Sequence, residues 1–417
     1  MRKTGSVPVF LASALLLAGA PAGAEDGVRW QSPVEIAAGK GTKGPWRQNE
    51  SGYDYVDDGT AAFSPRGELA ALWVNQAAKD VFFRHPDGTV VNVSRSPETY
   101  SWLPRVVYAP QDAKRVHVLW QEIIFSGGSH GGDILFATSA DGGKSFSPPR
   151  NLSRSQGGDG KGRIDRKTWD NGSLDLAAGA DGAVYAAWTD YEGRLYLSVS
   201  ADAGGTFSSP RRIAGSDRYP ARGPSIAIGP DRTLYLAWTH GEDRGADIFV
   251  SRSTDGGATF SPGRVIVDTP PYSDAPKLAV DARGTVHVAF ADGDRILYSR
   301  SGDGGRSFGS PRALSDSPAG FPSIAVDPHG NVVVLWERLR DGRPHGLGFA
   351  HSRDAGRSFA APTVVPGSEP EPGAWNGSQQ GLLAKKLALG ADGAIAAVNS
   401  SLAPGARSRV WLIRGTL

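Results

Sequence analysis

Short alternating apolar runs recur along the chain in pairs, and a turn rich in Asp, Pro and Gly separates the two runs of each pair. Alternation of Ile, Val or Leu with smaller residues has the period of a strand. The turn residues are those that join two strands into a hairpin. Seven hairpins are therefore predicted, at 60–74, 103–121, 173–189, 224–239, 276–291, 322–337 and 385–400.

A second pattern, Ser-x-Asp-x-Gly-x-(Ser/Thr)-Phe, lies between successive hairpins. Its five copies centre on Asp141, Asp202, Asp255, Asp303 and Asp354. A strand precedes each copy and a short run containing Pro follows it, so that each repeat holds four strands. Repeats of this length and content predict a β-propeller.

The repeated motif resembles the Asp-box of the sialidase-like (neuraminidase, BNR-repeat) propellers, and the resemblance extends over nearly the whole chain after residue 28. In this loop glycine supplies positive φ and the Asp side chain accepts backbone N–H groups. We therefore expect the five Asp residues to be structural. Repeated catalytic or calcium-binding carboxylates are the alternative.

The expected fold is all-β, a propeller of seven four-stranded blades. The last hairpin lacks an outermost strand, and Trp30–Ala37 resembles the missing one. We predict that this N-terminal strand pairs with the last blade and closes the ring without a free edge. Sialidases proper have six blades, so a six-bladed ring, with one weak hairpin used otherwise, is the alternative.

Composition and charge narrow the class of protein. The 55 Gly, 29 Pro, 11 Trp, 11 Tyr and 15 Phe favour a turn-rich β fold. Residues 1–24 have the basic, apolar and small-residue regions of a signal peptide, leaving 25–417 as one exported domain, periplasmic or extracellular. Without Arg2 and Lys3 the basic and acidic residues balance, which argues against nucleic-acid binding. The absence of Cys excludes disulfides and thiolate sites.

Long, irregular segments join the blades and the second and third strands of each blade. In a four-stranded antiparallel blade these connections lie on one face, here called the loop face, opposite the Asp-box loops. Loops on a rigid scaffold commonly carry binding residues. The candidate ligand-binding residues on or near this face are Arg105, Arg166, Trp169, Arg222, Lys277, Lys385 and Trp375.

Four of these candidates, Arg105, Arg222, Lys277 and Lys385, stand at or just before the start of an inner strand, close to the ring axis. A group of cations there favours an anionic ligand, because Arg binds a carboxylate through two parallel hydrogen bonds. The alternative is that they pair with Asp175, Asp58 or other loop acids.

The resemblance to sialidases implies three Arg residues that bind the substrate carboxylate, a Tyr nucleophile assisted by Glu, and an Asp acid/base. The family's Arg-Ile-Pro element is absent, so these roles cannot be assigned residue by residue. The catalytic candidates are Asp190, Tyr191, Glu192, Tyr272 and Asp274.

Two functions follow from these patterns. The first is a secreted propeller, non-catalytic or of divergent activity, that binds a glycan or another anionic ligand on its loop face; a protein partner is also compatible with this fold. The second is an exo-α-sialidase-type glycoside hydrolase that releases a terminal acidic sugar. We expect a monomer with no cofactor, no metal and no membrane span.

Overall fold

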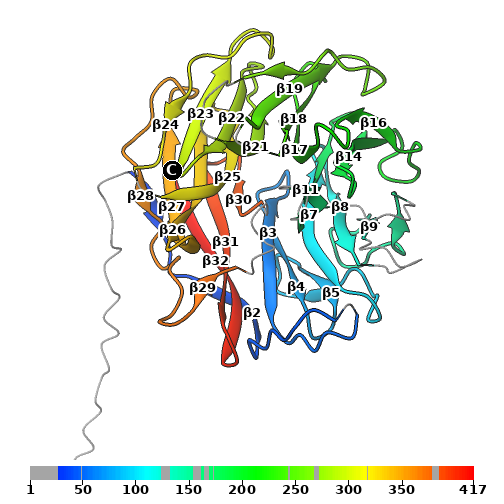
Figure 1. Ribbon diagram of the computed structural model, residues 1–417, viewed down its shortest axis with the longest axis vertical. Helices are drawn as coiled ribbons and strands as arrows, with labels where there is room; N and C mark the ends of the chain where they lie inside the picture. The colour runs from blue at the N-terminus through cyan, green and yellow to red at the C-terminus, as the bar shows by residue number, and fades with distance from the viewer. Residues whose placement is uncertain are drawn as a thin grey trace, which may run out of the picture.

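The computed structural model describes residues 27–47, 49–123, 132–153, 161–163, 169–171, 173–242, 245–266, 272–316, 318–377 and 385–417. Antiparallel sheets are arranged as seven blades around a central axis (Figure 1). The predicted seven-bladed propeller is thereby confirmed. No helix in this part of the chain has the length and hydrophobicity that a membrane crossing requires. The predicted signal peptide lies outside the described residues.

Each blade places its first strand at the axis. These inner strands are β3 (Val56–Phe63), β7 (Ser101–Ala109), β13 (Leu174–Ala178), β17 (Ala221–Ile228), β21 (Ser273–Val280), β25 (Ala319–Val326) and β30 (Leu387–Leu389). Every inner strand contacts that of the next blade, and β30 contacts β3 to complete the ring.

The second, third and fourth strands follow outward. The second strands are β4 (Leu69–Asn75), β8 (Asp112–Glu122), β14 (Val184–Thr189), β18 (Leu234–His240), β22 (Val286–Asp292), β26 (Val332–Arg340) and β31 (Ala394–Ala403). The third strands are β5 (Asp80–Arg84), β9 (Asp133–Ser139), β15 (Leu195–Ser200), β19 (Asp247–Ser253), β23 (Arg295–Ser301), β27 (Arg343–Ser352) and β32 (Arg407–Thr416). The fourth strands of the first six blades are β6 (Val90–Asn92), β10 (Arg150–Asn151), β16 (Arg211–Ala214), β20 (Arg264–Val265), β24 (Arg312–Ala313) and β28 (Thr363–Val364).

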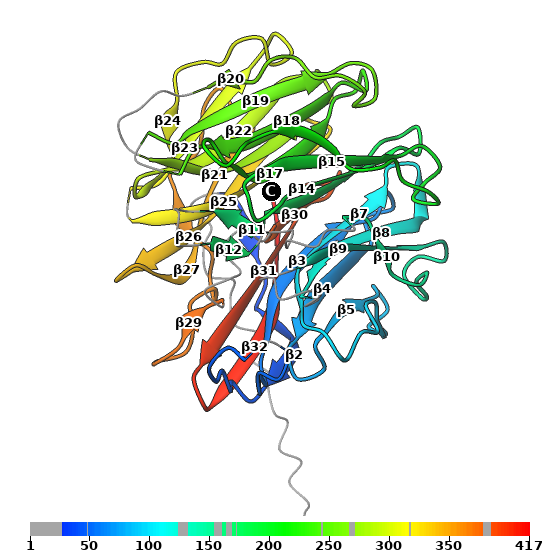
Figure 2. The same cartoon turned by 45° about the vertical axis from the view of Figure 1, so that its right-hand side comes forward.

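The N-terminal strands complete the seventh blade. Both β1 (Arg29–Trp30) and β2 (Val34–Gly39) pair with β32, with Trp30 opposite Gly415 and Val34 opposite Leu412. Figure 2 shows β2 beside β32. The Trp30 ring also packs edge-on against Phe349 of blade 6, with ring centroids 5.1 Å apart. The predicted closure by Trp30–Ala37 is confirmed.

Three short strands stand outside the four-strand pattern. β29 (Trp375–Asn376) pairs with β31 on the same side as β30. β11 (Lys161–Arg163) pairs with β12 (Trp169–Asn171), and β11 contacts the inner strand β17.

The stabilising core lies between neighbouring blades. Alternate side chains of facing sheets interdigitate, so that one cluster joins Val250 of blade 4 to Val288 and Phe290 of blade 5. The aromatic residues that end the second strands are largely buried there; Trp120 and Trp188 are fully buried. Apolar residues at period two therefore bury both faces of each sheet.

The Asp-box loops have the geometry that their sequence predicts. Asp255 Oδ1 accepts the Ser253 hydroxyl at 2.7 Å and the Thr259 N–H at 2.8 Å. The Thr259 hydroxyl and N–H, together with Ser253, hold the pKa of Asp255 at about 2. Gly257, at φ +85°, donates its N–H to the Ser253 hydroxyl. The other four loops repeat these bonds around Asp141, Asp202, Asp303 and Asp354.

After four of the five Asp-box loops an arginine reaches the Asp-box loop of the next blade. Arg211 donates to the Ala258 carbonyl at 2.6 Å, and Arg264 and Arg312 bond the equivalent carbonyls of the following loops at 3.2 and 2.8 Å. In each case the accepting residue lies three positions after the Asp of its loop. The Pro-Arg or Pro-x-Arg sequence after these four motifs thus joins the outer edge of one blade to the next.

We expect Arg312→Ala to lower the free energy of unfolding by about 0.5–1 kcal/mol, because it removes one exposed inter-blade hydrogen bond. Urea denaturation measures the change. Arg283→Ala, at an exposed hairpin turn, is the matched control and should change stability less. Equal effects of the two substitutions would show that the inter-blade bond contributes nothing.

Candidate functional site

One residue occupies the same position in six inner strands and directly before the seventh, β30, four residues before the hairpin turn. These head residues are Thr60, Arg105, Asp175, Ser225, Lys277, Ser323 and Lys386. In five blades a β-bulge precedes the head residue. The bulge contains a residue with positive φ: Asp58, Leu103, Gly223, Ala275 or Phe321. The bulge is therefore a repeated feature inside the inner strand, directly before the head residue.

Head residues also connect neighbouring blades. Asp175 Oδ2 accepts the N–H of Ile226 at 2.8 Å, and the Ser225 hydroxyl accepts the N–H of Leu278 at 3.0 Å. The Thr60 hydroxyl donates to the carbonyl of Lys385 at 2.8 Å. These bonds fix the head residues of different blades relative to one another.

Four charged side chains from four blades meet at this level of the axis. Lys385 Nζ lies 2.7 Å from Asp175 Oδ1, and Arg105 Nε lies 3.9 Å from the same oxygen. Arg105, Asp175 and Lys277 are at most 4% exposed, whereas the side chain of Lys385 is 31% exposed. We call these four residues the axial cluster. It contains three basic groups and one carboxylate.

Burial and neighbouring charges oppose each other at Asp175 but act together at Lys277. Burial raises the pKa of Asp175, but the charges of Lys385 and Arg105 outweigh it, and the pKa lies below its ordinary value. Burial, and then the positive charge of Arg105, lower the pKa of Lys277 to about 7. Asp175 is thus fully ionised at neutral pH, while Lys277 is near its titration midpoint.

Of two further acids near these cations, Asp274 is shared with Arg222, and Asp58 supplies little compensating charge. Its Oδ2 accepts the Leu103 N–H at 3.0 Å, while Oδ1 has no hydrogen-bond partner among the described residues. Burial and the neighbouring Asp57 raise the pKa of Asp58 to about 7. The other buried cation at the axis, Lys386, is paired with Glu337 and bonded to Asn399 at 3.0 Å. The axial cluster therefore carries an excess of positive charge at neutral pH.

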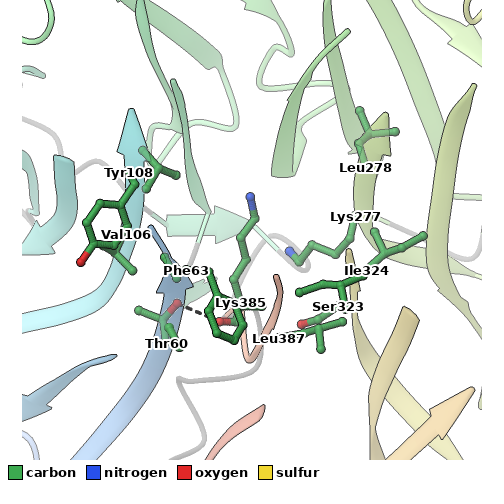
Figure 3. Close-up of a pocket in the computed structure, with 15 residues that line it drawn as sticks. Thr60, Phe63, Val106, Tyr108, Lys277, Leu278, Ser323, Ile324, Lys385 and Leu387 are labelled. Carbon is green, nitrogen blue, oxygen red and sulfur yellow. Dashed lines mark hydrogen bonds between the residues drawn. The ribbon is translucent and has the colours of Figure 1, made fainter. Parts of the chain in front are cut away.

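A cavity of about 290 Å³ adjoins the axial cluster. Its polar groups include the amino groups of Lys277, from β21, and Lys385, which precedes β30; Figure 3 shows both side chains at the cavity. Most other lining side chains are apolar, among them Phe63, Val106 and Ile324. The cavity thus offers positive charge beside an apolar wall.

Arg222 does not belong to the axial cluster, although the sequence groups it with Arg105. In the sheet, Arg222 of β17 lies opposite Thr239 of β18, before the β-bulge of β17. Its guanidinium donates a hydrogen bond to the Tyr272 hydroxyl. Asp274 receives hydrogen bonds from Tyr272 at 3.2 Å and from Thr239 at 2.7 Å, and lies 3.5 Å from the guanidinium. The structure thus brings three predicted site residues, Arg222, Tyr272 and Asp274, into one group next to Lys277.

The other catalytic candidates form a separate turn. Asp190 accepts the N–H groups of Glu192 and Arg194, at 3.0 and 2.8 Å, and lies 3.1 Å from the Arg194 guanidinium. Glu192 pairs with the same guanidinium. The acids that flank Tyr191 are therefore engaged inside the turn after β14.

The remaining ligand-binding candidates have different positions. Trp375 lies in β29, and the guanidinium of Arg343 is 4.9 Å from its ring centre. Trp169 begins β12, whose backbone alone is described, and Arg166 lies outside the described residues. Within the described part of the chain no group of three or more His, Asp or Glu residues could hold a metal ion.

The sequence predicted the cations of the axial cluster and Asp175 as a partner, but it missed the ring of head residues. The sequence pattern that marks these head residues is a single polar residue at the start of each inner apolar run, four residues before the turn. It also missed that Lys386, rather than Lys385, occupies the seventh head position. Lys386 turns to Glu337, and Lys385 reaches Asp175 instead.

No family model and no curated protein matches this chain. Among solved structures, a PL25 polysaccharide lyase, an ulvan lyase, has a TM-score of 0.58 at 12% identity, with 86% of this chain and 94% of that one covered. The same kind of lyase bound to -[GlcA(1-4)Rha3S]- has a TM-score of 0.56 at 13% identity, covering 88% and 96%. A protein of unknown function from Dyadobacter fermentans has a TM-score of 0.55 at 13% identity, covering 78% and 97%. At these identities the likeness shows the β-propeller fold alone.

Proposed function

We propose that this protein is exported and binds an acidic saccharide, or a similar small anion, at the axial cluster, in the cavity that extends from the head residues toward the hairpin turns. The observation that carries the proposal is the charge imbalance at the axis: Arg105, Lys277 and Lys385 share one carboxylate, Asp175. Buried charges need compensation, and an anionic ligand supplies it.

The accessibility of Lys385 supports binding from solvent. Its side chain is partly exposed while its amino group reaches Asp175 and the cavity. A carboxylate could bond Lys385 from the cavity side, with the apolar wall beside the sugar ring. A structural neighbour holds a glucuronate-containing saccharide in its own structure, which is compatible with this class of ligand.

Calorimetry with methyl β-glucuronide tests the proposal, with methyl β-glucoside as the neutral counterpart. We expect the glucuronide to bind more tightly, and Lys385→Gln to weaken its binding about tenfold to a hundredfold, the value of one charged hydrogen bond. Lys40→Gln is the control, because Lys40 is exposed and paired with Asp54 at 3.0 Å. Equal binding of both glycosides, or no effect of Lys385→Gln, would contradict the proposal.

A second candidate function is glycoside hydrolysis of a terminal acidic sugar. The observation that favours it is the Tyr272 hydroxyl, which contacts both Arg222 and Asp274 beside the axial cluster. A tyrosine in such a setting could act as a nucleophile. Fluorogenic sialosides test this function: turnover that Tyr272→Phe abolishes would support it, and no turnover by the wild-type protein would exclude sialidase activity.

A further inference from the structure

The amino group of Lys277 is unusual among the cations of the axis. Lys385 is paired with Asp175, and Lys386 with Glu337. Among the described residues, Lys277 Nζ has no hydrogen bond and no carboxylate within 4 Å. Its side chain is 4% exposed and ends in the axial cavity (Figure 3). The structure therefore holds an amine in the cavity that no carboxylate contacts directly, although Asp175 and Asp274 act on its charge from further away.

The surroundings of Lys277 favour the neutral amine. Apolar side chains, among them Leu278 and Ile324, line part of the cavity beside it, and burial disfavours the ammonium form. The nearby cations Arg105 and Lys385 add repulsion, and the pKa of Lys277 falls to about 7. A lysine desolvated beside other cations is an activated nucleophile, because its lone pair is free at neutral pH.

The charges next to Lys277 determine which kind of ligand would bind beside its amine. Lys385 lines the same cavity and can hold a carboxylate close to Lys277, with the positive charge of Arg105 nearby. The cavity volume of about 290 Å³ is at the lower end of ligand pockets, which suits one small molecule or one sugar residue. A ligand that carries both a carboxylate and a carbonyl would satisfy both kinds of group.

We propose that Lys277 Nζ forms an imine with the carbonyl carbon of a small oxo-carboxylate, namely an α-oxo acid or the open-chain form of an acidic sugar. The proposal rests on the anion binding proposed above. The amine attacks the carbonyl carbon, a C–N bond forms, and the carbonyl oxygen leaves as water after taking up the two protons that nitrogen loses. No oxidant or reductant is needed, and hydrolysis reverses the step.

Reductive trapping tests the proposal on the full mature chain. The protein is incubated with glyoxylate and cyanoborohydride at neutral pH, and the labelled lysines are located by peptide mass spectrometry. We expect Lys277 to be labelled at least about tenfold faster than the exposed Lys40, because far more of its amine is neutral at this pH. Labelling at Lys277 no faster than at Lys40 would overturn the imine.

Two further probes separate this inference from the proposed function. Propionaldehyde has the carbonyl without the carboxylate, and we expect it to label Lys277 more slowly than glyoxylate. Lys385→Gln keeps the amine and should slow labelling by glyoxylate but not by propionaldehyde. Binding of methyl β-glucuronide, which has no free carbonyl, without selective labelling would leave anion binding intact and remove the imine alone. Selective labelling without any carboxylate preference would instead contradict the oxo-carboxylate assignment.

Discussion

Lys277→Met should raise the free energy of unfolding by about 3–5 kcal/mol at neutral and lower pH. This is the free energy that corresponds to a pKa shift of roughly three units between the folded and the unfolded chain. Burial and the charge of Arg105 lower the pKa of Lys277 to about 7, from 10.5 in an unfolded chain. The unfolded chain therefore binds more protons between these two values, and wild-type stability rises with pH across this window. Methionine has a similar length and needs no solvation.

Urea denaturation of both proteins across this window measures the effect. The advantage of Lys277→Met should be largest below about pH 7 and should vanish near pH 10.5. Lys40→Met is the control, since its side chain is 82% exposed and no comparable stabilisation is expected. A constant difference between wild type and Lys277→Met at every pH would show that packing, rather than charge, is the cause.

The fold could be predicted from the sequence because the sequence patterns that indicate it are local and repeated. Each hairpin has its own alternation and turn, and each Asp-box loop uses donors within a few residues of its Asp. The closure by Trp30–Ala37 was also predictable, since that segment resembles the fourth strands of other blades and the last blade lacked one. Each pattern alone is weak evidence for a propeller, but its repetition along the chain makes the prediction strong.

The site was harder to predict from the sequence because its contacts join blades that are distant in the sequence. Arg105, Asp175 and Lys385 meet only when three inner strands face one axis, and small differences in local geometry decide which residue arrives. Two adjacent lysines show this: Lys386 turns away to Glu337, so Lys385 takes its place beside Asp175. Neither the composition nor the spacing of the repeats shows which of the two lysines lies beside Asp175.

Asp175→Asn should be the most damaging single substitution in the axial cluster. The carboxylate compensates Lys385 and Arg105 at the axis and accepts the Ile226 N–H from the next blade. Breaking a buried ion pair by removing one partner costs about 3–5 kcal/mol, because the other charges remain buried. Urea denaturation at neutral pH measures the loss. Asp392→Asn, at an exposed turn where asparagine keeps the acceptor for the Ala394 N–H, is the control.

The pH dependence of this loss has the opposite sign to that of Lys277. The pKa of Asp175 is lowered in the folded protein, so its stabilisation is present above the unfolded pKa and is lost as the pH falls through the folded one. The difference between wild type and Asp175→Asn should therefore shrink on acidification.

A double variant tests whether the residues of the axial cluster act together. With Asp175 neutralised, Lys277 faces Arg105 and Lys385 with less compensating charge and its pKa falls further, so at about pH 5 Lys277→Met should stabilise the Asp175→Asn protein by about 1–3 kcal/mol more than it stabilises wild type. The same loss of negative charge should tighten the binding of methyl β-glucuronide. Additive stabilities with unchanged binding would mean that Asp175 and Lys277 do not interact, and the axis would then lack the shared positive field on which anion binding depends.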